Sequence, residues 1–264
     1  HAEFFEVLNG SVQGLLKYMS ASSNGISSNW KPAVNGILDA YVGKDIKEFE
    51  WKGKKYTPQS YATSIGLTMD DYVSLTSFTN HAPYAKCQLA IPDNYNWGDS
   101  YNVGLDDLMS TVSNALANGY TVAWGADVSE KGFSFKNGIA LVPEDPSTIQ
   151  VSGKDNRNYN DAGADRNSNA FLSPTKEVSV TAELRQKGYD NKTTTDDHGM
   201  HIVGLYKEKS TGMEYYLVKN SWGTGNYPKG YLYVSEQYFR LKTINIYLHK
   251  GGISPELKKK INLN

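Results

Sequence analysis

Two neighbouring segments of the sequence contain residue types that could carry proton transfer or nucleophilic chemistry. The first is 196–204 (DDHGMHIVG), and the second is 215–223 (YYLVKNSWG). A histidine titrates near neutral pH, so it can accept a proton and return it during a reaction. An asparagine carboxamide can orient such a ring. The sequence therefore singles out His198 and Asn220 as catalytic candidates.

The spacing of the two segments predicts that these side chains meet across a β-hairpin. Residues 207–213 contain Gly and Ser between two apolar runs, which is typical of a hairpin loop. If Tyr206 lies opposite Glu214, then His198 and Asn220 fall within two positions of each other. Strand side chains alternate between faces, and in this register the two side chains share a face.

An imidazole and a carboxamide on one face could share a hydrogen bond. The amide oxygen would accept from one ring nitrogen and fix the tautomer, and the other nitrogen could exchange a proton with a nucleophile. Trp222 follows closely and could cover this bond. The spacing leaves an alternative open, in which His198 is a polar residue at a strand start with no catalytic role.

A metal site is a further alternative, because Asp196, Asp197, His198 and His201 lie close together in the sequence. However, a His-x-x-His pair on a strand points its two rings to opposite faces. The sequence therefore favours no metal and no cofactor, and it predicts a structural role for His201.

Hydrophobic periodicity and turn residues predict that a mixed α+β architecture positions these groups. Helices are predicted at residues 3–19, 30–42, 57–66, 105–118 and 175–187. Strands are predicted in a hairpin at 46–56 and at 73–78, 88–91, 120–125, 199–206, 214–220 and 230–235. The polar runs predict a loop at 92–104 and a solvated tail at 254–264 (SPELKKKINLN).

Composition excludes several classes of protein. The chain has 264 residues, of which 39% are hydrophobic and 12% aromatic, so it can bury a core. Its 27 Lys and Arg balance 28 Asp and Glu, which speaks against a dedicated nucleic-acid binder. No apolar run is long enough for a membrane span. A single cysteine excludes an internal disulfide.

Two further features of the sequence lead to expectations. The polar segment 152–169 offers Asp155, Asp161 and Asp165 to a cation, but their spacing matches no EF-hand, so a solvated loop is expected. The sequence begins His-Ala-Glu-Phe-Phe, with neither an initiator Met nor a signal-peptide pattern. This start leads us to expect that the chain has been cut from a longer one.

Together, DDHGMHIVG and 219–234 (KNSWGTGNYPKGYLYV) resemble the histidine and asparagine segments of papain-like cysteine peptidases. The nearer resemblance is to the bleomycin hydrolase or aminopeptidase C branch. The segments that carry it are DDYVSLTSFTNHAPY, PDNYNWGDSYNV, NGYTVAWGADVSEKGF and TAELRQKGYDNKTTTDDHGMHIVG. The resemblance implies a papain-like α+β fold, with His198 as general base and acid, Asn220 as its orienting partner and Trp222 as the cover over the pair.

The family's nucleophile has no counterpart in this sequence. The family places a Gln-…-Gly-…-Cys-Trp segment before the histidine, whereas Cys87 lies in NHAPYAKCQLAIP with no Trp after it and no helix start to lower its pKa. We therefore expect Cys87 to be a structural or incidental thiol, and a Cys-bearing N-terminal segment or partner chain to supply the nucleophile. A catalytically inactive relative that binds peptides or regulates is the alternative.

The resemblance also implies an organisation. Residues 1–70 would belong to an inserted helical region, and residues 71–264 would form the mainly β, barrel-like half. The strand 120–127 would line the cleft, which makes Trp124, Gly125 and Asp127 candidate contacts for a peptide substrate. The branch forms homo-hexamers, and its C-terminal tail lies in the cleft and restricts it to aminopeptidase activity. The resemblance implies a cytoplasmic location, and export stays open.

Overall fold

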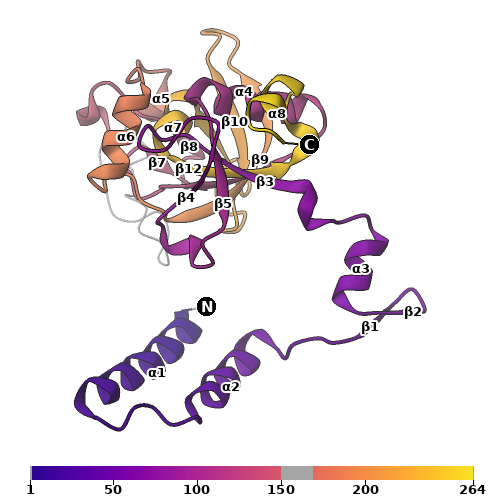
Figure 1. Ribbon diagram of the computed structural model, residues 1–264. Helices are drawn as coiled ribbons and strands as arrows, with labels where there is room; N and C mark the ends of the chain where they lie inside the picture. Colours follow the sequence, from indigo (N-terminus) through magenta and orange to yellow (C-terminus); the bar gives the residue numbers. More distant parts are fainter. Residues whose placement is uncertain (1, 150–168, 264) are drawn as a thin grey trace. The chain divides into compact units, whose positions relative to one another are not determined.

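The structure is a computed structural model that describes residues 2–149 and 169–263 (Figure 1). The chain divides into two compact units, His1–Thr68 and Met69–Asn264. Within the described parts of the chain, no helix combines the length and the apolar character needed to span a membrane.

The first unit consists of helices and one small hairpin. Its elements are α1 (Ala2–Ala21), α2 (Trp30–Val42), β1 (Phe49–Trp51), β2 (Lys54–Tyr56) and α3 (Pro58–Ser64). Lys52 and Gly53 connect the two strands, and both have positive φ angles, of 50° and 74°. A two-residue turn with this geometry matches the twist of a hairpin, which explains why Lys-Gly marks the turn. A capping box between Thr57 and Ser60 starts α3.

The second unit is built on a ten-stranded sheet with the order β4-β5-β3-β12-β6-β9-β10-β11-β8-β7. Its strands are β3 (Tyr72–Thr76), β4 (Lys86–Gln88), β5 (Asp99–Asn102), β6 (Val122–Ala126), β7 (Phe133–Ser134), β8 (Ile139–Ala140), β9 (His198–Lys207), β10 (Glu214–Lys219), β11 (Tyr231–Ser235) and β12 (Thr243–His249). Its helices are α4 (Leu105–Ala117), α5 (Asn169–Leu172), α6 (Ala182–Asp190), α7 (Glu236–Lys242) and α8 (Pro255–Lys260), with short 3₁₀ turns at Met69–Asp71, Pro92–Asn94, Pro146–Thr148 and Lys250–Gly252.

The core lies between the central strands and the helices α4, α7 and α8. In β6, Val122, Trp124 and Ala126 are buried, whereas Ala123 between them is exposed. This alternation follows the pleat of the strand, so one face of β6 points into the core. β6 pairs with β9 so that Ala126 lies opposite His198. This pairing places the start of β9 next to the end of β6.

Some predicted elements differ from the observed ones. β5 lies within the predicted loop 92–104, because its polar sequence DSYN shows no apolar alternation and its pairing with β3 and β4 makes it a strand. The helix predicted at 175–187 is observed as α6 at Ala182–Asp190. The helices α5 and α7 and the strands β7, β8 and β12 were not predicted from the sequence. The polar segment 152–169 lies outside the described residues, apart from its last residue.

The prediction of a solvated C-terminal tail is wrong. Ser254 caps α8, and Leu257 and Ile261 are buried in the core. Lys260 forms an ion pair with Asp107 of α4, with 3.0 Å between Nζ and Oδ2. The lysine-rich composition of the tail suggested a solvated segment. The signal for a helix was the spacing of its two buried apolar residues, four apart, which is typical of a helix with a narrow apolar stripe.

Substitution of Leu257 by alanine tests this packing. Because Leu257 is only 4% exposed, we expect the substitution to lower the free energy of unfolding by about 2–5 kcal/mol. Denaturant unfolding followed by tryptophan fluorescence would measure the change. Lys259→Ala, on the exposed side of the same helix, is the control and should change stability by less than about 0.5 kcal/mol. Equal, small effects of the two variants would mean that the tail does not pack into the core.

Candidate active site

The hairpin of β9 and β10 carries the two candidate residues, and its register differs in part from the predicted one. Tyr206 pairs with Tyr215 rather than with Glu214. A β-bulge then shifts the register by one residue, so that Lys219 pairs with His201, as the predicted register requires. The prediction is therefore wrong at the loop end of the hairpin and correct at the end next to the site, because the extra residue lies between them.

The structure brings His198 and Asn220 into direct contact. His198 Nε2 lies 2.8 Å from Asn220 Oδ1. An amide oxygen can only accept, so Nε2 carries the proton and Nδ1 of the neutral ring carries none. The carboxamide is 8% exposed, and its oxygen also accepts from the backbone N–H of Ser221 at 2.7 Å. The backbone N–H of Asn220 donates to the carbonyl of Gly230 at 2.9 Å. These bonds hold the orienting group in place.

Trp222 lies against the histidine, as the sequence predicted. The ring centroids of His198 and Trp222 are 4.9 Å apart, and the planes are tilted by 34°. The indole is itself held edge-on by Phe133 and Phe135, at centroid distances of 5.9 and 5.4 Å. Because these two rings belong to the core, the indole is fixed over one side of the imidazole. This arrangement limits access of water to the bond between His198 and Asn220.

Burial sets the protonation state of the histidine. The pKa of His198 is lowered from its usual value because the half-buried ring is partly desolvated, while the bond to Asn220 and the negative charge of Asp197 act in the opposite direction. A lowered pKa keeps the imidazole neutral near pH 7. A neutral ring with one unprotonated nitrogen can act as a general base.

Removal of the carboxamide should be visible in the titration of the histidine. In Asn220→Ala, we expect the pKa of His198 to fall further, because the bond to Asn220 favours the protonated ring. NMR titration of the ring protons would measure this shift. Asn118→Ala, at the exposed end of α4, is the control and should leave the titration unchanged. An unchanged pKa of His198 in Asn220→Ala would mean that the bond does not persist in solution.

Trp124 and Asp127 do not lie where the sequence analysis placed them. Both side chains are only 1% exposed, which contradicts the prediction that they contact a substrate. Trp124 Nε1 donates to Thr243 Oγ1 at 2.8 Å within the core. Asp127 lies in a polar network with Ser129 and Lys242. Trp124 is buried because it lies on the core face of β6, whereas Asp127 follows the strand and is buried within its polar network.

Gly125, the third predicted contact, faces a cleft on the opposite side of β6. The cavity has a volume of about 450 Å³, and Gly125, Asp196 and Asn245 contribute to its wall. Gly125 pairs with Gly199, the residue after His198. A space large enough for a side chain thus lies beside the start of β9. Of the three predicted contacts on this strand, only Gly125 borders it.

Cys87 is remote from the histidine in the sheet. It lies in β4, which β5, β3, β12 and β6 separate from β9. With strands about 4.8 Å apart, this corresponds to about 24 Å measured along the sheet. Burial and the nearby charge of Asp99 raise the pKa of the thiol, so it is mainly protonated at neutral pH. These features agree with the expectation that Cys87 is not the nucleophile.

The four residues considered as metal ligands each have other partners. Asp196 accepts from the N–H of Asp93, and Asp197 accepts from Thr195 Oγ1. His201 Nε2 lies 2.7 Å from Thr121 Oγ1, on the face opposite to His198. Within residues 2–149 and 169–263, no cluster of three or more potential ligands is found.

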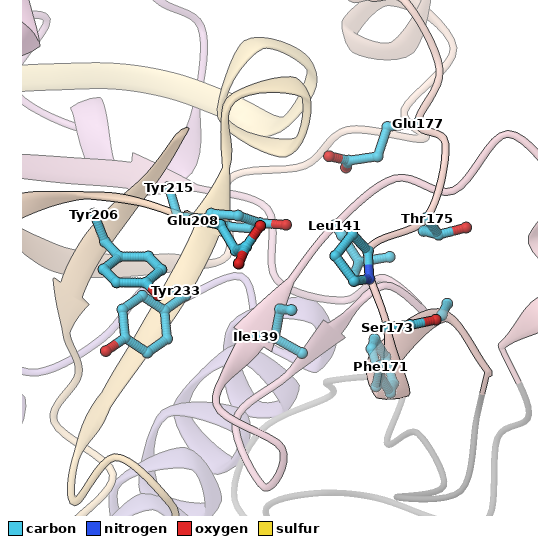
Figure 2. Close-up of a pocket in the computed structure, with 12 residues that line it drawn as sticks. Ile139, Leu141, Phe171, Ser173, Thr175, Glu177, Tyr206, Glu208, Tyr215 and Tyr233 are labelled. Carbon is cyan, nitrogen blue, oxygen red and sulfur yellow. The ribbon is translucent and has the colours of Figure 1, made fainter. Parts of the chain in front are cut away.

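Figure 2 shows a second pocket, of about 230 Å³, in another part of the sheet. Its wall includes Tyr206, Tyr233 and Glu177, and the two tyrosine rings lie 5.2 Å apart. Glu177 is a half-buried carboxylate that accepts from the N–H of Val142 and from Ser235 Oγ, both at 2.6 Å. Of the predicted functional residues that the structure describes, none borders this pocket.

The buried carboxyl of Asp127 should make stability depend on pH. Burial and a hydrogen bond with Asp197 raise its pKa from 3.8 to about 6. Between these values the folded state binds more protons than the unfolded state, so the contribution to stability is greatest below pH 4 and is lost as the pH rises through 6. We expect this group to change the unfolding free energy by about 3 kcal/mol across the interval. The measurement is the difference between the pH profiles of the parent chain and Asp127→Asn, and parallel profiles would contradict it.

Comparisons with known proteins give one family match and several similar folds. The model of the Peptidase C1-like family matches residues 177–264, the C-terminal third of the chain, which includes His198, Asn220 and Trp222. No curated protein matches the sequence.

Among solved structures, PepW from Lactobacillus rhamnosis matches with a TM-score of 0.57 and 17% identity, over 96% of this chain and 55% of that one. The chain thus spans about half the length of this structure. Bromelain from Ananas comosus, in complex with the E64 inhibitor, matches with a TM-score of 0.29 and 13% identity, over 54% of this chain and 46% of that one.

These findings define the class of fold. The chain has a papain-like α+β fold, in which the sheet carries a histidine–asparagine pair under a tryptophan. Its C-terminal third is related to the Peptidase C1-like family, which supports a peptidase-related function.

Sequence reasoning did not find the polar network behind the histidine. Lys242 donates to Asp127, Glu130 and the carbonyl of Thr193. A distance of 115 residues separates Lys242 from Asp127 in the sequence, and no local pattern links them. The one signal in the sequence was an aspartate directly after a buried strand, which is an unusual place for a charge without a partner.

Proposed function

We propose that this chain is the histidine- and asparagine-bearing part of a cysteine peptidase, in which another segment or chain supplies the nucleophilic thiol. The observation that carries the proposal is the 2.8 Å contact between His198 Nε2 and Asn220 Oδ1 beneath Trp222. With Nε2 held by the amide, Nδ1 is the nitrogen that would take the proton from a thiol. Cys87 cannot fill this role from its position in β4.

The reaction would be acyl transfer to sulfur. The thiolate attacks the peptide carbonyl, and the C–N bond breaks as protonated His198 gives its proton to the leaving amine. His198 then takes a proton from water, which attacks the thioester and releases the acid and the thiol. Asn220 keeps the ring oriented through both steps. The cleft beside Gly125 would receive the peptide.

The finer proposal is an aminopeptidase of the bleomycin hydrolase or aminopeptidase C type, assembled as a homo-hexamer. It is supported by the resemblance of the segments described above. In this chain, α8 and the residues up to Leu263 pack against α4 and the core. A restriction of hydrolysis to the N-termini of peptide substrates would therefore have to come from another part of the assembled peptidase.

The test is to purify the chain from its natural source together with whatever is bound to it. We expect intact mass spectrometry to show a longer chain or a second polypeptide with a thiol that iodoacetamide alkylates, and hydrolysis to be lost in step with this alkylation. Coumarin-linked peptides with free or acetylated N-termini would distinguish amino- from endopeptidase activity. Size-exclusion chromatography with light scattering would report the oligomer.

Other outcomes would contradict the proposal. Loss of hydrolysis upon alkylation of Cys87 alone would show that the thiol is in this chain. Peptide binding without hydrolysis in a preparation that contains every co-purifying chain would favour the inactive, peptide-binding or regulatory relative. Loss of hydrolysis with a chelator, without loss upon alkylation, would favour metal chemistry.

A further inference from the structure

The turn before His198 is held by side chains rather than by regular structure. Residues 193–197 connect the end of α6 to β9 and belong to neither helix nor strand. The N–H of Thr195 donates to Asp127 Oδ2 at 3.2 Å. The carbonyl of Thr193 accepts from Lys242 Nζ at 2.6 Å. The direction in which the chain enters β9 therefore depends on Asp127 and Lys242.

Asp127 is itself fixed at the end of β6. Its Oδ1 accepts from the N–H and the hydroxyl of Ser129, at 2.9 and 3.0 Å. Its Oδ2 accepts from Lys242 at 3.3 Å in addition to the turn. The preceding residue, Ala126, pairs with His198 across the ladder. Asp127 is thus the residue that follows the strand position opposite the histidine.

A second carboxylate makes the same connection in the opposite direction. Asp197, on the turn, accepts from the N–H groups of Val128 and Ser129 at 3.3 and 3.2 Å. Asp127, after β6, accepts from Thr195 on the turn. Each of the two chain segments therefore offers a carboxylate to backbone donors of the other. Such a reciprocal arrangement restricts sliding of the turn along β6 as well as its separation from β6.

We propose that Asp127, together with Lys242, is a positioning residue that sets the orientation of the His198 ring toward Asn220. The importance of this positioning for catalysis rests on the proposed function, whereas the positioning of the ring does not depend on it. Both oxygens of the Asp127 carboxylate accept hydrogen bonds. An asparagine would replace one of these oxygens with an NH₂ group, which would then face other donors, such as those of Thr195 and Lys242. A lysine buried this deeply is rare without a partner, and Lys242 has Asp127 and Glu130.

The test is the NMR state of the His198 ring in Asp127→Asn. We expect the population of the Nε2-protonated tautomer to decrease, because the turn is released and the bond between His198 and Asn220 is no longer held. We also expect the titration of His198 to differ from that of the parent chain, because the bond to Asn220 and the desolvation of the ring both contribute to its pKa. The charged groups of the network beside the ring are Asp197, Glu130 and Lys242, and all of them stay in the variant.

Glu177→Gln is the matched control. Glu177 is half-buried rather than fully buried, but like Asp127 it is a carboxylate that accepts from a backbone N–H and from a hydroxyl, and its partners lie next to β8 and in β11. This substitution should lower thermal stability without changing the tautomer or the titration of His198. A folded Asp127→Asn in which both readouts match the parent chain would overturn the proposal, because a merely structural role would change stability alone.

A second measurement covers the case in which Asp127→Asn does not fold. In the parent chain, the amide hydrogen of Thr195 should exchange with solvent at least about 100-fold more slowly than in an unstructured peptide, since it donates to a buried carboxylate. Rapid exchange would overturn the proposal. Both readouts are obtained on this chain without a thiol partner. A failure to find peptidase activity would therefore leave them intact, and a negative result here would leave the proposed function intact.

Discussion

Replacing His198 with alanine should lower kcat/KM for peptide hydrolysis by about 10²–10⁴-fold in the assembled peptidase, which is the usual contribution of a positioned proton-transfer group. The imidazole that would accept the thiol proton and protonate the leaving amine is then lost. Asn220 and Trp222 remain, but neither can exchange a proton at neutral pH. The effect should fall on kcat more than on KM, since the ring is not part of the wall of the cleft.

His201→Ala is the matched control for this prediction. It removes the same ring from the same strand three residues later, where the side chain is exposed and bonds to Thr121 on the opposite face. We expect its kcat/KM to stay within about twofold of the parent enzyme, because it touches no group of the site. Initial rates with a fluorogenic peptide would measure both variants. Equal losses of kcat/KM in the two variants would indicate a general effect on the sheet and would contradict the catalytic role of His198.

Substitution of Trp124 by alanine should cause the largest loss of stability among the residues discussed, about 3–5 kcal/mol. The indole is 1% exposed, lies 5.5 Å from the ring of Phe239 and donates to Thr243 Oγ1. The substitution removes these contacts and leaves a cavity where β6 meets α7. Urea unfolding, followed by circular dichroism, would measure the change.

Trp97→Ala is the control for this substitution. Trp97 is 60% exposed, so its removal should change stability by less than about 0.5 kcal/mol. If Trp124→Ala were as stable as the parent chain but bound peptides more weakly, the core position would be refuted. The role predicted from the sequence, as a contact in the cleft, would then be restored.

The sequence was most informative where a signal was local. The helix α4 has an apolar stripe and ends before Gly119, whose φ of 80° suits a helix stop. The turn of the first hairpin was marked by a lysine and a glycine, and α3 by Thr57 and Pro58. Each of these features depends on residues that are only a few positions apart in the sequence, so neighbouring residues suffice to predict it.

The pair of catalytic candidates was also accessible from the sequence, although through an incomplete argument. The predicted register, with one loop and strict alternation, places His198 and Asn220 on one face, and the structure has them in contact. The bulge that corrects the register leaves no signal in the sequence. It lies in the pairing of β9 with β10, whereas the pairing of β9 with β6 is regular.

Residue types and their order were enough to predict a papain-like α+β fold, by resemblance, and the meeting of the histidine, the asparagine and the tryptophan. They were not enough to predict that Trp124 and Asp127 are buried, that the lysine-rich tail packs against α4, or that Lys242 holds the turn before His198. Burial and long-range ion pairs depend on which face of an element meets a distant one. In a sheet this face changes with every single residue.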